Sequence, residues 1–206
     1  MPNDLPPWRA VYYHYRKVAR LGLWQELNDA LREKLRHRAG RKTSPSAAIL
    51  DSQSVKTTAV GGQRGFDAAK HVKGRKRHGL VDTLGLLLAV VVHRADIDER
   101  RGAGFVLVRL AKKRVCFLRL AVIFADGGYG GEFETLVKIT FGWLLHIVRK
   151  PFGLKTFVPF PKRWIVERTF GWLSSHRRLS VDYERNVKSS EAMIHLAMIR
   201  VMIGRF

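Results

Sequence analysis

Apolar residues near the start of the chain recur every three or four positions, which is the spacing of an amphipathic helix. The pattern runs from Pro6 to about Arg38, and Gly22 is expected to divide it into two short helices. Basic residues occupy the remaining faces. They fit either a pair of solvated helices or a DNA-binding segment, and the pattern alone does not decide between the two. Residues 39–46 have the composition of a linker.

Beyond the linker, short apolar runs alternate with helical patterns. The runs predict strands over residues 47–51, 79–82, 86–92, 120–126 and 143–148. Helices are expected over residues 99–114, 132–140, 164–179 and 190–203, the last with Ser189 or Ser190 as its N-cap. From residue 49 onward the order is strand, strand, strand, helix, strand, helix, strand, helix. That order predicts an α/β fold in which helices flank a mixed sheet.

Two of the expected strands form an antiparallel hairpin, because a turn that contains Gly85 separates them. The second strand, residues 86–92, is apolar on both faces, which predicts a central place in the sheet. The patterns together divide the chain into a basic helical segment over residues 1–45 and an α/β domain over residues 46–206.

The charge of the chain points to a polyanionic partner. Lys and Arg number 38 against 17 Asp and Glu, so the formal net charge is +21. A field of that size favours nucleic acid, although a generally basic surface would give the same total. The positive residues also cluster, most densely between Lys70 and His78.

The sequence lacks the motifs of several functional classes. Cys116 is the single cysteine, which excludes a disulfide framework and a cysteine-based zinc site. The longest apolar run is too short to cross a bilayer and no signal peptide is readable, so we expect a cytoplasmic protein without a membrane partner. Neither a Walker phosphate loop, a dinucleotide-binding glycine pattern nor a His-Glu-x-x-His zinc pattern occurs.

Asp51 and Asp126 stand out because each directly follows a run of buried-strand residues. If the two strands are parallel neighbours, the two carboxylates converge at one edge of the sheet. Two close carboxylates repel each other, and a hard divalent cation such as Mg²⁺ or Mn²⁺ removes that penalty. The alternative is two unrelated acids that each cap a turn, and the pattern leaves both interpretations open.

Glu167 is the third candidate acid. It lies between apolar neighbours near the start of a predicted helix and is flanked by Arg163 and Arg168. A charge there commonly serves only to stabilise the helix dipole. Phosphodiester chemistry with two metal ions about 3.5–4 Å apart needs one bridging carboxylate and others that hold each ion singly. Two strand-end aspartates and a helix-borne glutamate meet that requirement.

At these residues the chain resembles bacterial insertion-sequence transposases of the IS-five group, which use Asp-Asp-Glu chemistry. The motifs that carry the resemblance extend over nearly the whole chain: Leu5-Pro6-Pro7-Trp8 with Tyr12-Tyr13, Asp51-Ser52-Gln53-Ser54-Val55-Lys56-Thr57-Thr58, Lys73-Gly74-Arg75-Lys76-Arg77-His78, Leu80-Val81-Asp82-Thr83-Leu84-Gly85-Leu86-Leu87, Ala125-Asp126-Gly127-Gly128-Tyr129 and Trp164-Ile165-Val166-Glu167-Arg168-Thr169-Phe170-Gly171-Trp172-Leu173. The resemblance implies an RNase H-like catalytic domain. It also implies that Asp51, Asp126 and Glu167 are the catalytic triad and bind Mg²⁺ or Mn²⁺, as two ions.

The chain departs from the wider family at two places. The family signature Tyr-x2-Arg-x3-Glu-x6-Lys falls on Phe160, Arg163, Glu167 and Ser174, so only the Arg and the Glu match. Basic residues nearby, His176, Arg177 and Arg178, are candidates to replace the missing Lys. The chain also begins just before the Leu-Pro-Pro-Trp motif, whereas relatives often carry a further N-terminal DNA-binding region, sometimes in a separate reading frame.

The resemblance implies an enzyme that nicks DNA at the terminal inverted repeats of a mobile element. It then joins the 3′-hydroxyl to target DNA, acting as a homo-oligomer on the bacterial nucleoid. The expected DNA contacts are Lys70, Lys73, Arg75, Lys76, Arg77, His78, Arg163, Arg168, Arg177 and Arg178. Two alternatives remain open: a catalytically inactive, truncated DNA-binding remnant or regulator, and an RNase H-like host nuclease.

Overall fold

The computed structural model describes residues 4–60, 62–148 and 162–206. A mixed sheet forms its centre, with the strands β1 (Ala47–Lys56), β2 (Gly65–Asp67), β3 (Val72–Asp82), β4 (Leu87–Arg94), β5 (Val122–Ala125) and β6 (Leu144–Ile147). The strand order is β2-β3-β1-β5-β6, and β4 also pairs with β3. β1, β2, β3 and β4 pair antiparallel, whereas β5 is parallel to both β1 and β6.

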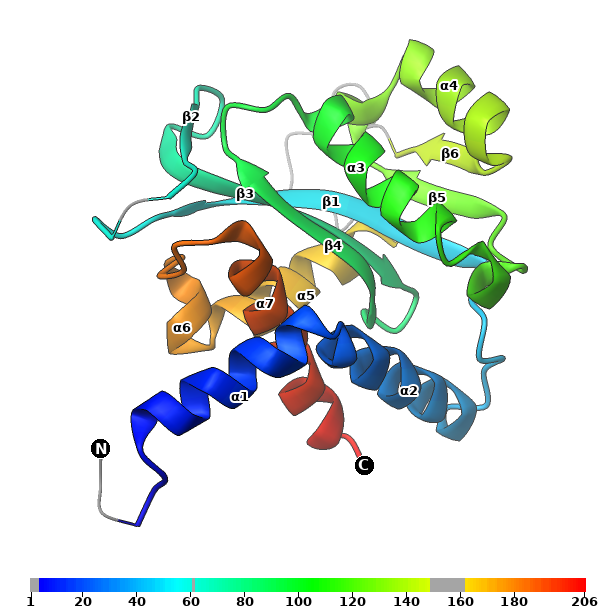
Figure 1. Cartoon of the computed structure of the whole chain (residues 1–206). Coiled ribbons are helices and arrows are strands. Elements are labelled where there is room, and N and C mark those ends of the chain that lie inside the picture. The colour runs from blue at the N-terminus through cyan, green and yellow to red at the C-terminus, as the bar shows by residue number, and fades with distance from the viewer. Residues whose placement is uncertain (1–3, 61, 149–161) are drawn as a thin grey trace.

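Helices cover both faces of the sheet (Figure 1). On one face lie α3 (Glu99–Ala111) and α4 (Glu132–Phe141), and on the other α5 (Arg163–Ser174), α6 (Arg177–Ser180) and α7 (Val187–Ile203). α1 (Trp8–Arg20) and α2 (Leu23–Arg38) join the second group, and short 3-10 turns occupy Arg114–Phe117 and Gly127–Tyr129. The predicted α/β class, a mixed sheet flanked by helices, is confirmed.

The alternation of side chains along β1 separates two hydrophobic cores. Ala48 and Leu50 point to the core beneath α3 and α4, whereas Ile49 points to the core beneath α5 and α7. Because successive strand residues face opposite sides, the same rule assigns Asp51 to the α5 side and Ser52 to the α3 side. This division determines which helices can reach each polar residue of the strand.

The element order predicted from the sequence is confirmed, with local corrections. The short strand β2 was not predicted, and β3 begins at Val72, so it includes the basic cluster. The predicted helix over 164–179 is two helices, α5 and α6. The N-cap of α7 is Asn186 instead of Ser189 or Ser190, because the Asn186 side chain accepts a hydrogen bond from the Lys188 amide. Gly22 does separate α1 from α2, with a left-handed φ of 74°.

The prediction that residues 86–92 form a central strand is wrong, since β4 lies at an edge of the described sheet. Its apolar character reflects helices on both faces. Its exposed edge is closed by side chains: Glu191 accepts from the Val92 amide at 3.0 Å, and Asn28 and Arg109 donate to carbonyls of the strand. Side chains thus satisfy main-chain groups that an edge otherwise offers to another strand.

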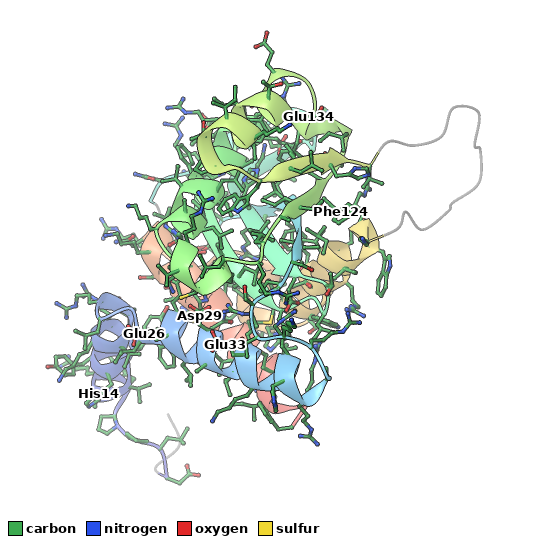
Figure 2. All side chains as sticks on the ribbon, turned by 90° about the vertical axis from the view of Figure 1, so that its right-hand side faces the viewer. His14, Glu26, Asp29, Glu33, Phe124 and Glu134 are labelled. Carbon is green, nitrogen blue, oxygen red and sulfur yellow. The ribbon has the colours of Figure 1, made fainter. Side chains whose placement is uncertain are left out.

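The N-terminal helices differ in how they join the rest of the protein. Figure 2 shows α1, which carries His14, set apart from the body, with α2, which carries Asp29 and Glu33, alongside it. α1 has no buried residue. α2 is tied to the turn between β3 and β4, because Arg36 donates to the buried carboxylate of Asp82 at 2.6 Å. The domain boundary at residue 45 stays a prediction.

No helix among the described residues is long and apolar enough to cross a membrane.

We expect two buried histidines to cost the protein stability as the pH falls from about 7 towards 4. Burial lowers the pKa of His195 to about 4, and burial followed by the charge of His93 lowers the pKa of His78 to about 2. Below pH 6.5 these histidines become protonated in the unfolded chain but stay neutral in the folded protein. The stability that their neutral forms contribute is therefore present above pH 6.5 and is lost as the pH falls below it.

Urea unfolding across that pH range measures the effect. His195→Leu should make the free energy of unfolding less dependent on pH, by up to about 1.4 kcal/mol per pH unit. The exposed His14→Asn is the matched control, because solvent reaches that side chain in both states. An identical pH dependence in His195→Leu and wild type would contradict the prediction.

Candidate active site

The parallel pairing of β1 with β5 brings the two candidate aspartates together. Ile49 is paired with Phe124 in the register of the two strands, and each aspartate follows its strand partner by two residues. Asp51 and Asp126 are therefore level on strands that lie about 4.8 Å apart. The predicted convergence of the two acids is confirmed as geometry; their catalytic role is a separate question.

The ionised form of Asp51 is costly in the folded protein. Its pKa is raised to about 7, chiefly by burial and in smaller part by the charge of Asp126. The amide of Ser52, which donates to Oδ1 of Asp51 at 2.7 Å, lowers the pKa, as do the charges of Lys70 and Arg163. Asp126 accepts a hydrogen bond from the Gly128 amide at 3.0 Å. Positive charge beside Asp51 therefore favours the ionised form of this carboxyl group.

Glu167 lies on α5, the helix that covers the Asp51 side of the sheet. Its Oε1 atom accepts from Nη2 of Arg163 at 2.8 Å and from Nε at 3.1 Å. Although burial lowers the pKa of Arg163, the bond and the ion pair with Glu167, together with the charges of Asp51 and Asp126, raise it overall. Arg163 thus links the helix-borne acid electrostatically to the two strand-borne acids.

The start of α5 is fixed against the same strand. The ammonium group of Lys162 lies 4.1 Å from the centre of the Phe124 ring, which faces this helix (Figure 2). Phe124 precedes Asp126 by two residues, so the contact joins the start of α5 to the end of β5. The position of Glu167 therefore depends on packing between α5 and the sheet.

The donor set suits a hard divalent ion, since Asp51, Asp126 and Glu167 all offer carboxylate oxygen. The repulsion between Asp51 and Asp126 is what a cation would relieve. Within the described residues, no group of three or more His, Cys, Asp or Glu side chains is close enough to hold a metal ion. The two aspartates therefore form the preorganised part of the set, while Glu167 is engaged by Arg163.

Glu99, the first residue of α3, belongs to the site although it was not among the predicted site residues. Its Oε1 accepts from Oγ of Ser52 at 3.0 Å and from Nζ of Lys70 at 3.1 Å. Lys70 also donates to the carbonyl of Ser52 at 3.2 Å. This cluster fixes the main chain next to Asp51 from the opposite face of the sheet. In sequence Glu99 looks like an ordinary first-turn acid that follows the N-cap Asp98.

A glycine separates this acid from the aspartates. A Cβ atom on Gly128 would lie 2.9 Å from Oε2 of Glu99 and 3.2 Å from Oδ1 of Asp126. A side chain there would require the flexible end of Glu99 to shift and Asp126 to give slightly, so glycine lets both carboxylates keep their positions.

Much of the predicted DNA-binding cluster is buried inside β3. Arg75 pairs with Asp182 at 3.2 Å and donates to the carbonyl of Glu184, and Arg77 donates to the carbonyl of Leu179. These two arginines face the α6 side and hold the segment that leads into α7. Their burial leaves no surface that a phosphate could reach in this conformation.

The intervening residues of β3 face the α3 side. Lys76 pairs with Asp67 at 3.2 Å, and Nδ1 of His78 lies 2.8 Å from Nε2 of His93. Both Lys76 and His78 are buried as well. The alternation of a strand therefore distributes Arg75, Lys76, Arg77 and His78 between two interiors, where they bind protein groups.

The remaining predicted DNA contacts are at the surface. Lys70, Lys73, Arg177 and Arg178 are exposed, and Arg163 and Arg168 are partly exposed. Arg178 pairs with Glu184 at 2.8 Å, and Arg168 lies between two tryptophan rings. Of the residues in the family signature, Phe160 lies outside the described residues, and Ser174 accepts a hydrogen bond from Gln53 at 3.0 Å. The DNA-binding role of all these residues remains to be tested.

Residues 42–202 match the family described as the transposase DDE domain. That match covers most of the chain, including all three candidate acids, and the chain belongs to this family. A comparison with curated proteins finds no match.

Among solved structures, the chain is similar to the catalytic core domain of BIV integrase, at 11% identity and a TM-score of 0.42, covering 74% of this chain and 84% of that one. It is similar to a chain of the simian T-cell lymphotropic virus intasome in complex with PP2A regulatory subunit B56 gamma, at 17% identity and a TM-score of 0.42. That match covers 73% of this chain and 48% of the intasome chain. It is also similar to the Mos1 mariner paired end complex with Mn, at 11% identity and a TM-score of 0.40. That match covers 88% of this chain and 60% of the Mos1 chain. The chain thus spans about half of the intasome chain.

Asp51→Asn should stabilise the protein in metal-free buffer. Because the pKa of Asp51 is raised from 3.8 to about 7, the folded protein retains a proton that the unfolded chain releases. That contribution to stability is complete below pH 3.8 and is lost as the pH rises through about 7. The gain from asparagine should be small near pH 4 and roughly 1–3 kcal/mol near pH 8.

Urea unfolding in EDTA at the two pH values measures the gain. Asp4→Asn in the exposed N-terminal segment is the control for a lost negative charge. It should leave the free energy of unfolding unchanged at both pH values. Equal free energies of unfolding for Asp51→Asn and wild type at the higher pH would contradict a raised pKa of Asp51.

The two halves of the basic cluster should respond differently to substitution. Arg75→Met leaves the buried carboxylate of Asp182 without its cation and should cost about 3–5 kcal/mol of unfolding free energy. Lys73→Gln alters an exposed side chain and should cost less than about 0.5 kcal/mol. Thermal or urea unfolding of both variants checks the difference, and similar costs would contradict the division of the cluster.

Proposed function

We propose that this protein is a DNA transposase that cleaves DNA at the ends of an insertion sequence and transfers the 3′-hydroxyl ends to target DNA. The observation that carries the proposal is the level placement of Asp51 and Asp126 on paired parallel strands, within a chain of the transposase DDE domain family. Their spacing and repulsion suit a site that gathers positive charge at a phosphodiester.

Asp51, Asp126 and Glu167 would hold Mg²⁺ or Mn²⁺, as two ions. When bound, such ions stabilise the charge on the attacking and leaving oxygens of a phosphodiester. The protein's own contribution is to position the donors. The cluster of Ser52, Lys70 and Glu99 holds the main chain beside Asp51, and Arg163, on which the charges of both aspartates act, holds Glu167 in an ion pair.

Arg163 and Lys70 also have a role toward DNA in this proposal. Both cations lie beside the carboxylates and both influence Asp51. A phosphate that enters the site brings negative charge to groups that are already repelling one another. Cations at this position offset that charge, and exposed Lys73, Arg177 and Arg178 would extend the contact along the backbone.

The finer assignments belong to the same proposal. The quoted motifs favour the IS-five group, a bacterial cytoplasmic enzyme that works on the nucleoid. Its partners would be the terminal inverted repeats, target DNA and further copies of the chain, together with a possible separately encoded N-terminal region.

Asp126→Asn should abolish metal-dependent strand cleavage and strand transfer while DNA binding persists. The amide keeps the shape of the side chain but removes an anionic oxygen donor, whereas the phosphate-binding cations are untouched. A nicking and strand-transfer assay on DNA with the element's own ends, with Mg²⁺, Mn²⁺ or EDTA, measures cleavage. Fluorescence anisotropy on the same DNA measures binding.

Asp96→Asn is the matched control, because Asp96 is an exposed loop aspartate that pairs with Arg94, and it should retain full activity. Full cleavage by Asp126→Asn would refute the proposed site. Tight binding without any product in the wild type would favour the inactive remnant. Cleavage of RNA–DNA hybrids without end specificity would favour the host nuclease.

A further inference from the structure

A buried tyrosine ends the turn that carries Asp126. Tyr129 closes the 3-10 turn Gly127–Tyr129, where its amide donates to the carbonyl of Asp126 at 3.2 Å. Its side chain is fully buried in the core beneath α3 and α4. Tyr129 therefore anchors one edge of the candidate site of Asp51, Asp126 and Glu167, which we call the carboxylate site.

The hydroxyl group of Tyr129 is buried and has no hydrogen-bond partner among the described residues. The hydroxyl group of Ser52 lies close enough to influence it, but Ser52 donates its one proton to Oε1 of Glu99 at 3.0 Å. A buried hydroxyl group without a partner destabilises the folded protein. Such a group in a native fold calls for a reason, and a role in binding or catalysis is one.

The charges of three carboxylates act on this hydroxyl group. The pKa of Tyr129 is raised well above its usual range, chiefly by burial and then by the charge of Asp51. Glu99 and Asp126 act in the same direction. The hydroxyl group therefore keeps its proton and lies among acceptors, which makes it a hydrogen-bond donor for the carboxylate site.

Asp51 is the acceptor that the surroundings of the hydroxyl group favour. Ser52, the neighbour of the hydroxyl group, directly follows Asp51 in β1. Within the described part of the chain, Oε1 of Glu99 already accepts two hydrogen bonds, whereas Asp51 accepts one, from the Ser52 amide. Asp51 is ionised when it binds a divalent cation, and an ionised carboxylate accepts a stronger hydrogen bond than a neutral one.

A buried histidine pair lies behind the ring of Tyr129. The ring is edge-on to His78, with 6.2 Å between the ring centres. Burial lowers the pKa of both His78 and His93, so both are neutral. Nδ1 of His93 lies 2.8 Å from the carbonyl of Arg94, which only accepts, so Nε2 of His93 must accept from Nδ1 of His78 at 2.8 Å. Nε2 of His78 is then an acceptor without a partner among the described residues, and it competes with Asp51 for the hydroxyl group.

We propose that Tyr129 is a positioning residue: when the carboxylate site holds a divalent cation, its hydroxyl group donates a hydrogen bond to Asp51 and fixes that carboxylate relative to Asp126. The main chain of Tyr129 belongs to the turn after β5, and its side chain lies beside Ser52 of β1, so one residue joins both strands that carry the aspartates. The inference rests on the proposed function, because it assumes that these acids bind the cation.

Tyr129→Phe tests the inference, because it removes the hydroxyl group and keeps the ring. Binding of Mn²⁺, followed by the electron paramagnetic resonance signal of the free ion, should weaken about 10- to 100-fold, which is the usual cost of losing a group that orients a metal ligand. In EDTA the midpoint of urea unfolding should rise, because the variant no longer buries a hydroxyl group without a partner. A purely structural role would not move the two quantities in these directions.

Tyr15→Phe is the matched control. The hydroxyl group of Tyr15 donates to the carbonyl of Ser189 at 2.8 Å and lies on α1, outside the carboxylate site. This variant should lower the urea midpoint, because it loses a hydrogen bond, and should bind Mn²⁺ as tightly as wild type. Cleavage by Tyr129→Phe should need more Mn²⁺ and should recover when Mn²⁺ saturates the site, which a damaged fold would not do.

Unchanged Mn²⁺ affinity in Tyr129→Phe would overturn the proposal. If the urea midpoint also fell, the hydroxyl group would be assigned to His78 instead. An equal loss of Mn²⁺ affinity in Tyr15→Phe would overturn it too, because the effect would not be specific to the site. Mn²⁺ binding that Asp126→Asn leaves intact would refute the carboxylate site itself. Binding that Asp126→Asn abolishes but Tyr129→Phe leaves unchanged would refute the role of Tyr129 alone, so the two failures are distinguishable.

Discussion

The parallel pairing of β1 with β5 is the constraint on which the rest of this site depends. It sets Asp51 and Asp126 level with each other, where burial and the charge of Asp126 make the negative charge of Asp51 costly. The cations around them then have a common explanation. Arg163 reaches them from α5 and Lys70 from the other face of the sheet, and each offsets charge that the strand pairing has concentrated.

The same sheet explains why so many basic residues lie inside the protein. β3 passes between two cores, so its consecutive charged residues point alternately into each. Arg75 satisfies the buried Asp182 and two carbonyls of the 184–185 segment, and Lys76 satisfies Asp67. The positive charge of the chain therefore has two parts: an internal part that joins segments distant in sequence, and an external part that is available to a polyanion.

α5 gives the site two adjoining surfaces. One side carries Glu167 and its partner Arg163, and the neighbouring side carries Arg168 stacked between the rings of Trp164 and Trp172. A single helix thus places an acidic group and a cationic, aromatic surface within one helical turn of each other. Packing of Thr169 against Gly85, where the hydroxyl donates to the carbonyl at 2.9 Å, fixes the rotation of the helix and so the direction of both sides.

The sequence by itself determined the α/β class, the order of the main elements, the break at Gly22 and the two strand-end aspartates, because hydrophobic periodicity and turn residues are local signals. Only the tertiary structure decided that β4 is an edge strand. In the sequence, an apolar run looks the same whether the strand lies between two other strands or lies at an edge beneath helices. Only the tertiary structure brought Glu99 to Ser52 and buried Arg75 to His78 within β3. Burial of a charged residue depends on partners far away in sequence, such as Asp182, and no local pattern encodes them.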